Sequence, residues 1–388
     1  MKARHALVIG IGVGAIGILA FGAIAGGGAV LELAGKVAGV TRSGAGSPSP
    51  EPAESPAPAS AAPSLASPTP TPAPTPSANN PGPRTGAAMV YDPENHGLIL
   101  FGGATALPQP DGTNLAHAYD DTWLWNGQSW RRLEVAGPST RSGAMAAYDS
   151  VRHEIVLFGG GGVDEAGNGS LLNDTWVWDG TEWHLRQPLH NPEPRFRAAM
   201  AFDQARGVAV MIGGEGAKGK VYTATTWTWD GADWTAHNAS TTPTARTFAG
   251  MAYSASTKEA VLYGGTWAGR QLSDTWLWDG SNWRRGPAGP AAGWTLLTYD
   301  DALNAVVGYI YTPSATSSAR LITWDGKTWS NRTSATIPSP RAQASLGYDA
   351  VNSRVVLYGG SYIEPVPYAE TWIWNHANWS LWEQPSGA

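Results

Sequence analysis

Five arginines recur at one fixed position of this sequence, and their guanidinium groups could recognise an anion. Each stands eight residues before the aspartate of a Tyr-Asp pair, or before the residue that replaces it. They are Arg84, Arg141, Arg195, Arg246 and Arg341. A guanidinium group offers a planar fork of donors that fits carboxylates and phosphates. The alternative is a structural role, in which each arginine forms a salt bridge or a carbonyl contact between neighbouring repeats.

A second position, two residues beyond each arginine, varies although the surrounding pattern does not. It holds Gly86, Gly143, Arg197, Phe248, Trp294 and Gln343. Side chains alternate along a strand, so residues two apart share one face. We therefore expect the four larger side chains to lie beside the arginines. Such a surface suits an acidic sugar or an acidic peptide, and we expect the ligand to enter near Trp294, whose repeat has Ala292 in place of the arginine.

One glycine-rich segment, residues 214–220, matches two phosphate-binding patterns, G-x-G-x-x-G and G-x-x-x-x-G-K. Both patterns need a helix directly after the loop. Here the next residues lead into a tryptophan-rich strand, and no Ser or Thr follows the lysine. We interpret the segment as a loop of the repeat.

Metal and nucleophile chemistry finds little support in the sequence. Asp164, Asn168 and Ser170 could offer oxygen ligands to calcium, but their spacing fits no standard loop. The eight histidines show no paired metal spacing, and the chain has no cysteine. Thiolate metal sites, disulfides and cysteine nucleophiles are therefore excluded. We expect no catalytic residue, no metal and no cofactor.

The elements that position these residues are repeats closed by tryptophans. The segment Asp-Thr-Trp-Leu-Trp-Asn-Gly-Gln-Ser-Trp at 121–130 recurs at 174–183, 225–234, 274–283 and 370–379, with a worn copy at 321–329. Of the 20 tryptophans, 17 fall in this register, so we expect them to form the core. Trp267 lies outside it, in a loop after a Gly-Gly pair, and is a candidate for sugar stacking or protein contact, or else a loop anchor.

Each repeat predicts four short strands. A small-residue strand ends at Tyr-Asp, an apolar run ends at Gly-Gly, a Thr-Trp-x-Trp strand follows, and a tight Asp-Gly or Asn-Gly turn leads to the fourth. No 3.6-residue period supports helices. Four-stranded units with a period near 50 residues indicate an all-β, six-bladed β-propeller of antiparallel blades. The chain begins with a first strand and ends with a fourth, so we expect blades 1 and 6 to meet by packing alone.

The Arg, Tyr-Asp, Gly-Gly and Trp positions resemble the kelch repeat, the blade motif also found in the central propeller of galactose oxidase. The resemblance covers residues 83–384 and implies fold and not oxidase chemistry, since the copper site of that family needs a cysteine. The fifth repeat departs from the motif at Ala292, at Ile310-Tyr311 in place of Gly-Gly, and at Ile322 in place of the first Trp. Other enzymes of this type imply a sugar-modifying alternative that uses acid/base residues such as Glu215 or Asp164.

The N-terminal part of the chain differs in composition. Residues 1–34 read as a membrane anchor or signal segment, because positions 6–31 carry no charge and are numerous enough to span a bilayer. Cleavage after a small-x-small site at 23–25 is the alternative. Residues 35–82 form a linker that is rich in Pro, Ala and Ser and is expected to be disordered. Positive charge before the apolar run favours a single-pass protein with an extracytoplasmic propeller.

Charge and composition narrow the partners. A net charge of −6 without a basic stripe excludes nucleic acid as an expected partner. Variable loops on a rigid scaffold usually carry binding. We therefore expect a membrane-anchored protein that binds a protein or an acidic glycan through its loop face. A carbohydrate-active enzyme and a structural spacer remain the alternatives.

Overall fold

The computed structural model describes residues 79–108, 114–163, 169–222, 225–313, 318–362 and 367–383. The predicted membrane or signal segment, residues 1–34, lies outside the described residues, as does nearly all of the predicted linker, 35–82. Within the part that is described, no helix has the length and apolar character needed to cross a membrane. The described contacts begin at Asn80, whose side-chain amide donates to the carbonyl of Ala369.

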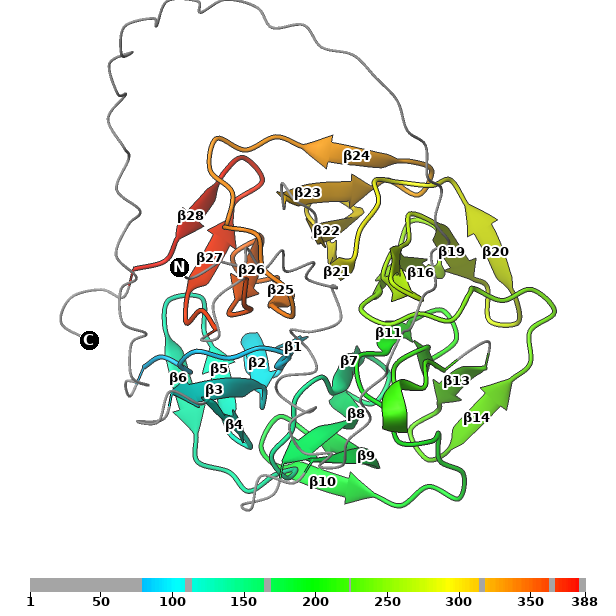
Figure 1. Cartoon of the computed structure of the whole chain (residues 1–388), viewed down its shortest axis with the longest axis horizontal. Coiled ribbons are helices and arrows are strands. Elements are labelled where there is room, and N and C mark those ends of the chain that lie inside the picture. Colours follow the sequence, from blue (N-terminus) through cyan, green and yellow to red (C-terminus); the bar gives the residue numbers. More distant parts are fainter. Residues whose placement is uncertain are drawn as a thin grey trace, which may run out of the picture. The chain divides into compact units, whose positions relative to one another are not determined.

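Six four-stranded antiparallel sheets surround a central axis, which confirms the predicted six-bladed β-propeller (Figure 1). Blade 1 consists of β1 (Ala88–Asp92), β2 (Gly97–Phe101), β5 (Thr122–Trp125) and β6 (Trp130–Leu133). Blade 2 consists of β7 (Met145–Asp149), β8 (Glu154–Val163), β9 (Gly169–Trp178) and β10 (Trp183–Arg186). Blade 3 consists of β11 (Ala199–Asp203), β12 (Val208–Ile212), β13 (Thr226–Trp229) and β14 (Trp234–His237). Blade 4 consists of β15 (Gly250–Ser254), β16 (Glu259–Tyr263), β19 (Thr275–Trp278) and β20 (Trp283–Gly286). Blade 5 consists of β21 (Trp294–Asp300), β22 (Ala305–Thr312), β23 (Ser318–Trp324) and β24 (Trp329–Arg332). Blade 6 consists of β25 (Ser345–Asp349), β26 (Arg354–Tyr358), β27 (Thr371–Trp374) and β28 (Trp379–Leu381).

The core lies in the seams, by which we mean the interfaces between neighbouring blades. The second strand of blade 1 is buried along its whole length because a neighbouring blade covers each of its faces. The register tryptophans fill the seams, as expected: Trp234 of blade 3 packs against Phe158 of blade 2 with ring centroids 5.1 Å apart. Burial of such large side chains supplies the main stabilising free energy of the ring.

A ring of Trp–Thr hydrogen bonds locks the outer part of the seams. The indole N–H of the tryptophan that opens a fourth strand donates to the threonine that opens the third strand of the preceding blade. The pairs are Trp183–Thr122, Trp234–Thr175, Trp283–Thr226, Trp329–Thr275 and Trp130–Thr371, at 2.8–3.0 Å. The sixth bond is missing, because Leu321 stands where the threonine belongs and the indole N–H of Trp379 has no partner among the described residues.

Blades 1 and 6 meet through hydrogen bonds as well as packing, which corrects the expectation of packing alone. The amide of Gly86 donates to the carbonyl of Gln343 at 2.8 Å, and the indole of Trp130 donates to Thr371 at 2.9 Å. The guanidinium group of Arg354 also donates to the carbonyl of Gly127. The propeller therefore closes without a strand shared between the two ends of the chain.

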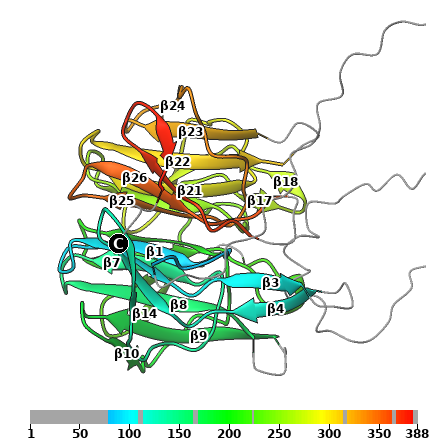
Figure 2. The ribbon, with the colours of Figure 1, turned by 90° about the vertical axis from the view of Figure 1, so that its left-hand side faces the viewer.

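The connections between second and third strands leave the ring on one side. Two of them form separate two-stranded sheets, β3 (Ala104–Pro108) with β4 (Asn114–Ala118), and β17 (Thr266–Trp267) with β18 (Arg270–Gln271). Figure 2 shows both hairpins projecting from the same side of the blades. We call this side the loop face, and it carries the candidate ligand site discussed below.

Candidate functional site

The five repeat arginines are buried inside their own blades. Each is 1% exposed. In blade 4, Nη1 of Arg246 donates to the carbonyl of Gly264 at 3.0 Å and to Oδ1 of Asp274 at 2.8 Å, while Nη2 donates to Oδ2 of Asp274 at 2.8 Å. Arg84 and Arg141 form the same contacts with the matching glycine carbonyl and with Asp121 and Asp174. Arg341 donates through Nη1 to the carbonyl of Gly359 and through Nη2 to Oε2 of Glu370.

The acidic partner also holds a tryptophan. The indole N–H of Trp276 donates to Oδ2 of Asp274 at 2.6 Å. Burial alone would raise the pKa of Asp274, but the hydrogen bonds and charge of Arg246, together with the indole, bring that pKa below its usual value. Blade 3 has Thr225 in place of the acid, and there Arg195 pairs with Glu193 at 2.7 Å instead.

These contacts favour the structural alternative for the repeat arginines, with one correction: the salt bridges and carbonyl contacts form within one blade and not between neighbouring repeats. Their donors point to carbonyls and carboxylates of the protein, and their side chains are covered. We therefore leave Arg84, Arg141, Arg195, Arg246 and Arg341 out of the ligand site proposed below.

The variable position forms a ring around the channel, which we call the mouth: Gly86, Gly143, Arg197, Phe248, Trp294 and Gln343. Backbone hydrogen bonds join its members from blade to blade. In four pairs the amide of one member donates to the carbonyl of the member in the preceding blade, at 2.7–3.3 Å: Gly86–Gln343, Gly143–Gly86, Arg197–Gly143 and Phe248–Arg197. In blade 5 the amide of Thr295, and not that of Trp294, donates to the carbonyl of Phe248 at 3.0 Å. Among the described residues, no such bond joins Gln343 to blade 5.

Three larger residues of the mouth are held in a conformation that favours glycine. Arg197, Phe248 and Gln343 have φ values of 58°, 59° and 54°, close to the 65° and 68° of their counterparts Gly86 and Gly143. A non-glycine residue in this region costs about 1–3 kcal/mol and is found preferentially at functional sites. Glycine would adopt this conformation without the strain, so we look for a role for the three side chains.

Arg197 extends across the mouth. Its Nη2 lies 3.3 Å from Oε1 of Gln343, which belongs to the opposite blade, and its Nη1 lies 3.5 Å from Oε2 of Glu215. The guanidinium carbon is 4.3 Å from the ring centre of Phe196 and 4.7 Å from that of Phe248. Burial lowers the pKa of Arg197 to about 10, and the charge of Glu215 limits that shift. The group stays cationic at neutral pH.

The mouth is asymmetric. On the side of blades 1 and 2 it is lined by glycines, and a Cβ atom on Gly143 would lie 3.3 Å from Cγ of Arg197. The absence of a side chain there gives the arginine room. Behind the mouth, the first strands of all six blades enclose a channel of about 160 Å³ that is lined mainly by Ala, Met and Leu.

An aromatic wall forms the other side of the mouth. Trp294 stacks on Tyr311 with ring centroids 5.3 Å apart and an interplanar angle of 26°, and it also packs against Phe248 at 5.1 Å. Tyr362 meets Tyr311 edge-on. Trp294 is 8% exposed, so it is more deeply set than the open notch that we expected near Ala292. The wall joins blades 4, 5 and 6.

Trp267 is exposed on the same face. It is 42% accessible and lies opposite Arg270 in the β17–β18 hairpin. Thr266 pairs with Thr247, the residue before Phe248, so the hairpin continues outward from the mouth. The side-chain amide of Gln271 donates to the carbonyl of Pro313 and ties the hairpin to blade 5.

A second hollow of about 660 Å³ lies on blade 1 beside the β3–β4 hairpin. Its lining includes Tyr119, Trp123, Asp120, Arg132 and Glu134. No sequence motif pointed to it. The two carboxylates and the arginine are exposed, and the ring of Tyr119 lies under the guanidinium group of the buried Arg84 at 4.1 Å.

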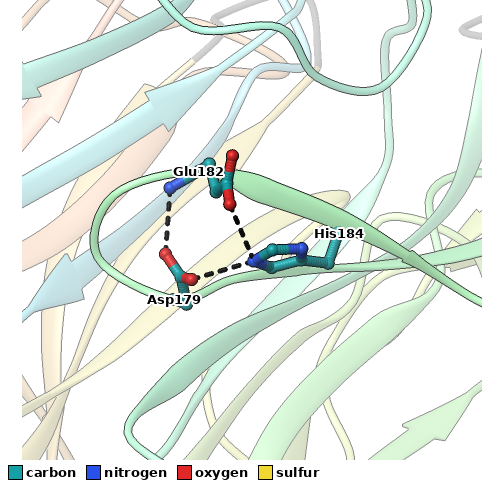
Figure 3. A group of neighbouring side chains, drawn as sticks. All are labelled: Asp179, Glu182 and His184. Carbon is teal, nitrogen blue, oxygen red and sulfur yellow. Dashed lines mark hydrogen bonds and ion pairs between the residues drawn. The ribbon is translucent and has the colours of Figure 1, made fainter.

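Asp179, Glu182 and His184 come together at the turn between β9 and β10 (Figure 3). Nε2 of His184 lies 2.8 Å from Asp179 and 3.8 Å from Glu182. Oδ1 of Asp179 accepts the amides of Thr181 and Glu182, which closes the turn. Asp230, Asp279 and Asp325 close the equivalent turns of other blades in the same way. We interpret Asp179 as a turn residue.

The other motifs stay outside the site. The segment 214–220 is a blade loop with a single short 3₁₀ turn, Ala217–Gly219, and no helix follows it, as we expected. Ser170 pairs with Gly162 within blade 2, and Asp164 and Asn168 lie outside the described residues. Glu215 is the exception, since it accepts from Arg197.

Sequence reasoning missed Tyr311 and Tyr362. Tyr311 had a signal, because it replaces the second glycine of the Gly-Gly pair in the fifth repeat. Glycine at that position normally makes a close backbone contact, so a bulky replacement requires space that another feature must provide. Tyr362 follows its own Gly-Gly pair at a position that varies in every repeat, so nothing marked it.

Comparison with known proteins assigns this chain to no family. No protein-family model matches the chain, and no curated protein is similar to it in sequence. A solved structure described as "Structure of YjhT" aligns with a TM-score of 0.49 and 15% identity, over 65% of this chain and 85% of that chain. A likeness at this level carries no argument about ligands.

Proposed function

We propose that this protein is an extracytoplasmic β-propeller of the kelch type that binds a glycan at the mouth on its loop face. The observation that carries the proposal is the polar group formed by Arg197, Glu215 and Gln343 beside the aromatic wall of Phe248 and Trp294. Its members come from blades 3 to 6 and meet only because the ring is closed.

The chemistry of the mouth suits a sugar. Aromatic rings pack against the apolar faces of a pyranose, and donors and acceptors are needed for its hydroxyl groups. Arg197 donates, Glu215 accepts, and Gln343 does both. Ligand sites are typically apolar surfaces with a few placed polar groups of this kind.

The charge of the mouth supports a broader ligand class than an acidic one. With the repeat arginines buried, Arg197 is the cation that the described contacts place at the mouth, and Glu215 is 3.5 Å from it. An acidic glycan would have to displace Glu215 or share Arg197 with it. We include acidic glycans in the proposal but do not require an acid group.

The backbone strain at three residues of the mouth favours a binding function over a purely structural spacer. Arg197, Phe248 and Gln343 hold left-handed conformations that glycine would adopt at lower cost. A spacer domain gains nothing from such residues. A binding role also needs no acid/base pair, and Glu215 is the single carboxylate that the described contacts bring to the mouth.

The membrane part of the proposal rests on the sequence. We propose that residues 1–34 hold the protein at the outer face of a membrane and that residues 35–82 separate the propeller from it. Protease added to intact cells should cut within the linker and release a folded propeller. Protection of the linker would argue for the opposite orientation.

A glycan and peptide array probed with the full-length protein tests the binding proposal. We expect binding to a restricted set of glycans and its loss in Gln343→Gly. Ser353→Gly is the matched control, since Ser353 has φ 50° but lies in an exposed turn of blade 6. Binding to peptides alone would favour a protein ligand, and turnover of a bound glycan would favour the enzyme alternative.

A further inference from the structure

The seam between blades 5 and 6 lacks both of the bonds that lock the other seams. The outer Trp–Thr bond is absent because Leu321 replaces the threonine that would accept from Trp379. The inner backbone bond is absent because, among the described residues, nothing in blade 5 accepts from or donates to the backbone of Gln343. The other five seams have both.

The seam between blades 5 and 6 reaches the mouth, and it retains a side-chain hydrogen bond, in which the hydroxyl of Tyr309 in blade 5 donates to the carbonyl of Ser339, ahead of the first strand of blade 6, at 3.0 Å. Trp294 stands on its blade 5 side and Gln343 on its blade 6 side. These residues form one edge of the proposed site, so separation of the two blades would widen that edge. At the remaining edges, backbone hydrogen bonds hold neighbouring members of the mouth together.

At the other end of this seam, His376 forms a contact that no other blade has. The turn between third and fourth strands has glycine at this position in the other blades, namely Gly127, Gly180, Gly231, Gly280 and Gly326. A side chain of the preceding blade lies against each glycine, for example Arg152 against Gly231. In blade 5 the residue at this position is Leu303, whose apolar side chain packs against the cluster of the seam and offers no hydrogen bond.

His376 compensates by reaching back. Its φ is 72°, a strained value for a non-glycine residue, and its Nε2 lies 2.8 Å from Oδ2 of Asp300, which is fully buried. The groups around this pair are acidic or neutral: Asp301 follows Asp300, the hydroxyl of Tyr348 accepts the amide of Ala302, and the ring of Trp374 lies edge-on to the imidazole. Partial burial and the nearby Asp300 raise the pKa of Asp301.

We propose that the seam between blades 5 and 6 is the edge at which the ligand mouth opens, and that the His376–Asp300 pair is its pH-sensitive latch. The link to ligand access rests on the proposed function. Protonated imidazole would face Asp300 as a full ion pair, which is stronger than the neutral hydrogen bond. The ion pair requires a protonated imidazole, so the latch tightens in acid and loosens at alkaline pH.

The chain has no cysteine, so one introduced thiol reports the opening of one seam. Ala344 follows Gln343 and packs in the seam between blades 5 and 6, and Ala249 follows Phe248 and packs in the seam between blades 3 and 4. Both are nearly buried, with 4% and 9% exposure. We would compare the rates at which a thiol reagent labels full-length Ala344→Cys and Ala249→Cys, because their ratio cancels the ionisation of the thiol.

The expected ratio exceeds one and rises as pH increases from about 6 to about 8, by roughly tenfold if the latch changes from an ion pair to a neutral hydrogen bond. His376→Gly in the Ala344→Cys protein should give the high ratio at both pH values. Leu321→Thr, which restores an acceptor for Trp379, should lower it. His153→Gly is the control, since His153 is also left-handed but exposed.

A ratio near one that is independent of pH would overturn the proposal, as would a ratio that His376→Gly leaves unchanged. No ligand enters this measurement. The latch can therefore fail while glycan binding holds, and the glycan array can fail while the seam opens as described.

Discussion

Nη2 of Arg197 in blade 3 lies 3.3 Å from Oε1 of Gln343 in blade 6, so one hydrogen bond joins opposite sides of the propeller across its mouth. Both residues hold positive φ values at equivalent positions of their blades. The fold accepts this strain at two independent blades, and the result is a polar contact beside an aromatic wall. A repeat protein can thus place a function at its axis by varying one position of each repeat.

Gln343→Gly should separate stability from binding. Relief of the left-handed strain offers about 1–3 kcal/mol, while glycine loses about 0.5–1 kcal/mol through its greater freedom in the unfolded chain. The lost side-chain bond to Arg197 costs about 1 kcal/mol. We expect a free energy of unfolding within about 1 kcal/mol of the wild type, together with weaker glycan binding. A large loss of stability would show that Gln343 is structural.

Arg246→Ala should lower the free energy of unfolding, because Arg246 has a structural role. It leaves the partly buried Asp274 without its charge partner and the carbonyl of Gly264 without that donor. Removal of one member of a buried pair typically costs about 3–5 kcal/mol. Urea unfolding of the variant checks this, with Arg270→Ala as the control because Arg270 is an exposed arginine of the same blade. Similar stability of the two variants would contradict the structural role.

The same pairs predict loss of stability in acid. The pKa of Asp274 is lower in the folded protein than its ordinary value, because Arg246 and Trp276 outweigh the effect of burial. The stabilisation is therefore complete above the unfolded pKa of about 4 and is lost as pH falls through the lower folded value. Asp274→Asn should show a shallower decline of stability below about pH 4. An identical slope would mean that the pair contributes no proton linkage.

The fold could be predicted from the sequence because the same pattern recurs in successive blades, so that the interpretation of one copy is supported by the others. The structural role of the arginines also leaves a trace in the sequence, in the repeat that lacks the arginine. Blade 5 lacks both members of the pair, with Ala292 for the arginine and Arg320 for the acid. Arginine and acid are therefore lost together in blade 5, whereas blade 3 keeps Arg195, has Thr225 in place of the acid and supplies Glu193 as the substitute partner.

The mouth could be predicted only in part. The variable position identified Arg197, Phe248, Trp294 and Gln343, since variation within a strict repeat needs a cause. Their conformation could not be predicted, because the positive φ values depend on the closed ring of backbone bonds. Tyr362 and the latch at His376 depend on contacts between blades, which the pattern within a single repeat does not contain.

Truncation of Trp283 should lower the free energy of unfolding, whereas truncation of Trp267 should leave it nearly unchanged. Trp283 is 1% exposed, packs in the seam between blades 3 and 4 and donates to Thr226, whereas Trp267 is 42% exposed. Trp283→Ala should lower the free energy of unfolding by about 3–5 kcal/mol, as large core truncations do. Trp267→Ala should change it by less than about 0.5 kcal/mol.

If the glycan extends outward from the mouth along the β17–β18 hairpin, Trp267→Ala should weaken binding of longer oligosaccharides and leave the shortest bound ones unaffected. Denaturant unfolding and titration of both variants would decide the matter, and equal destabilisation by the two would remove Trp267 from the site.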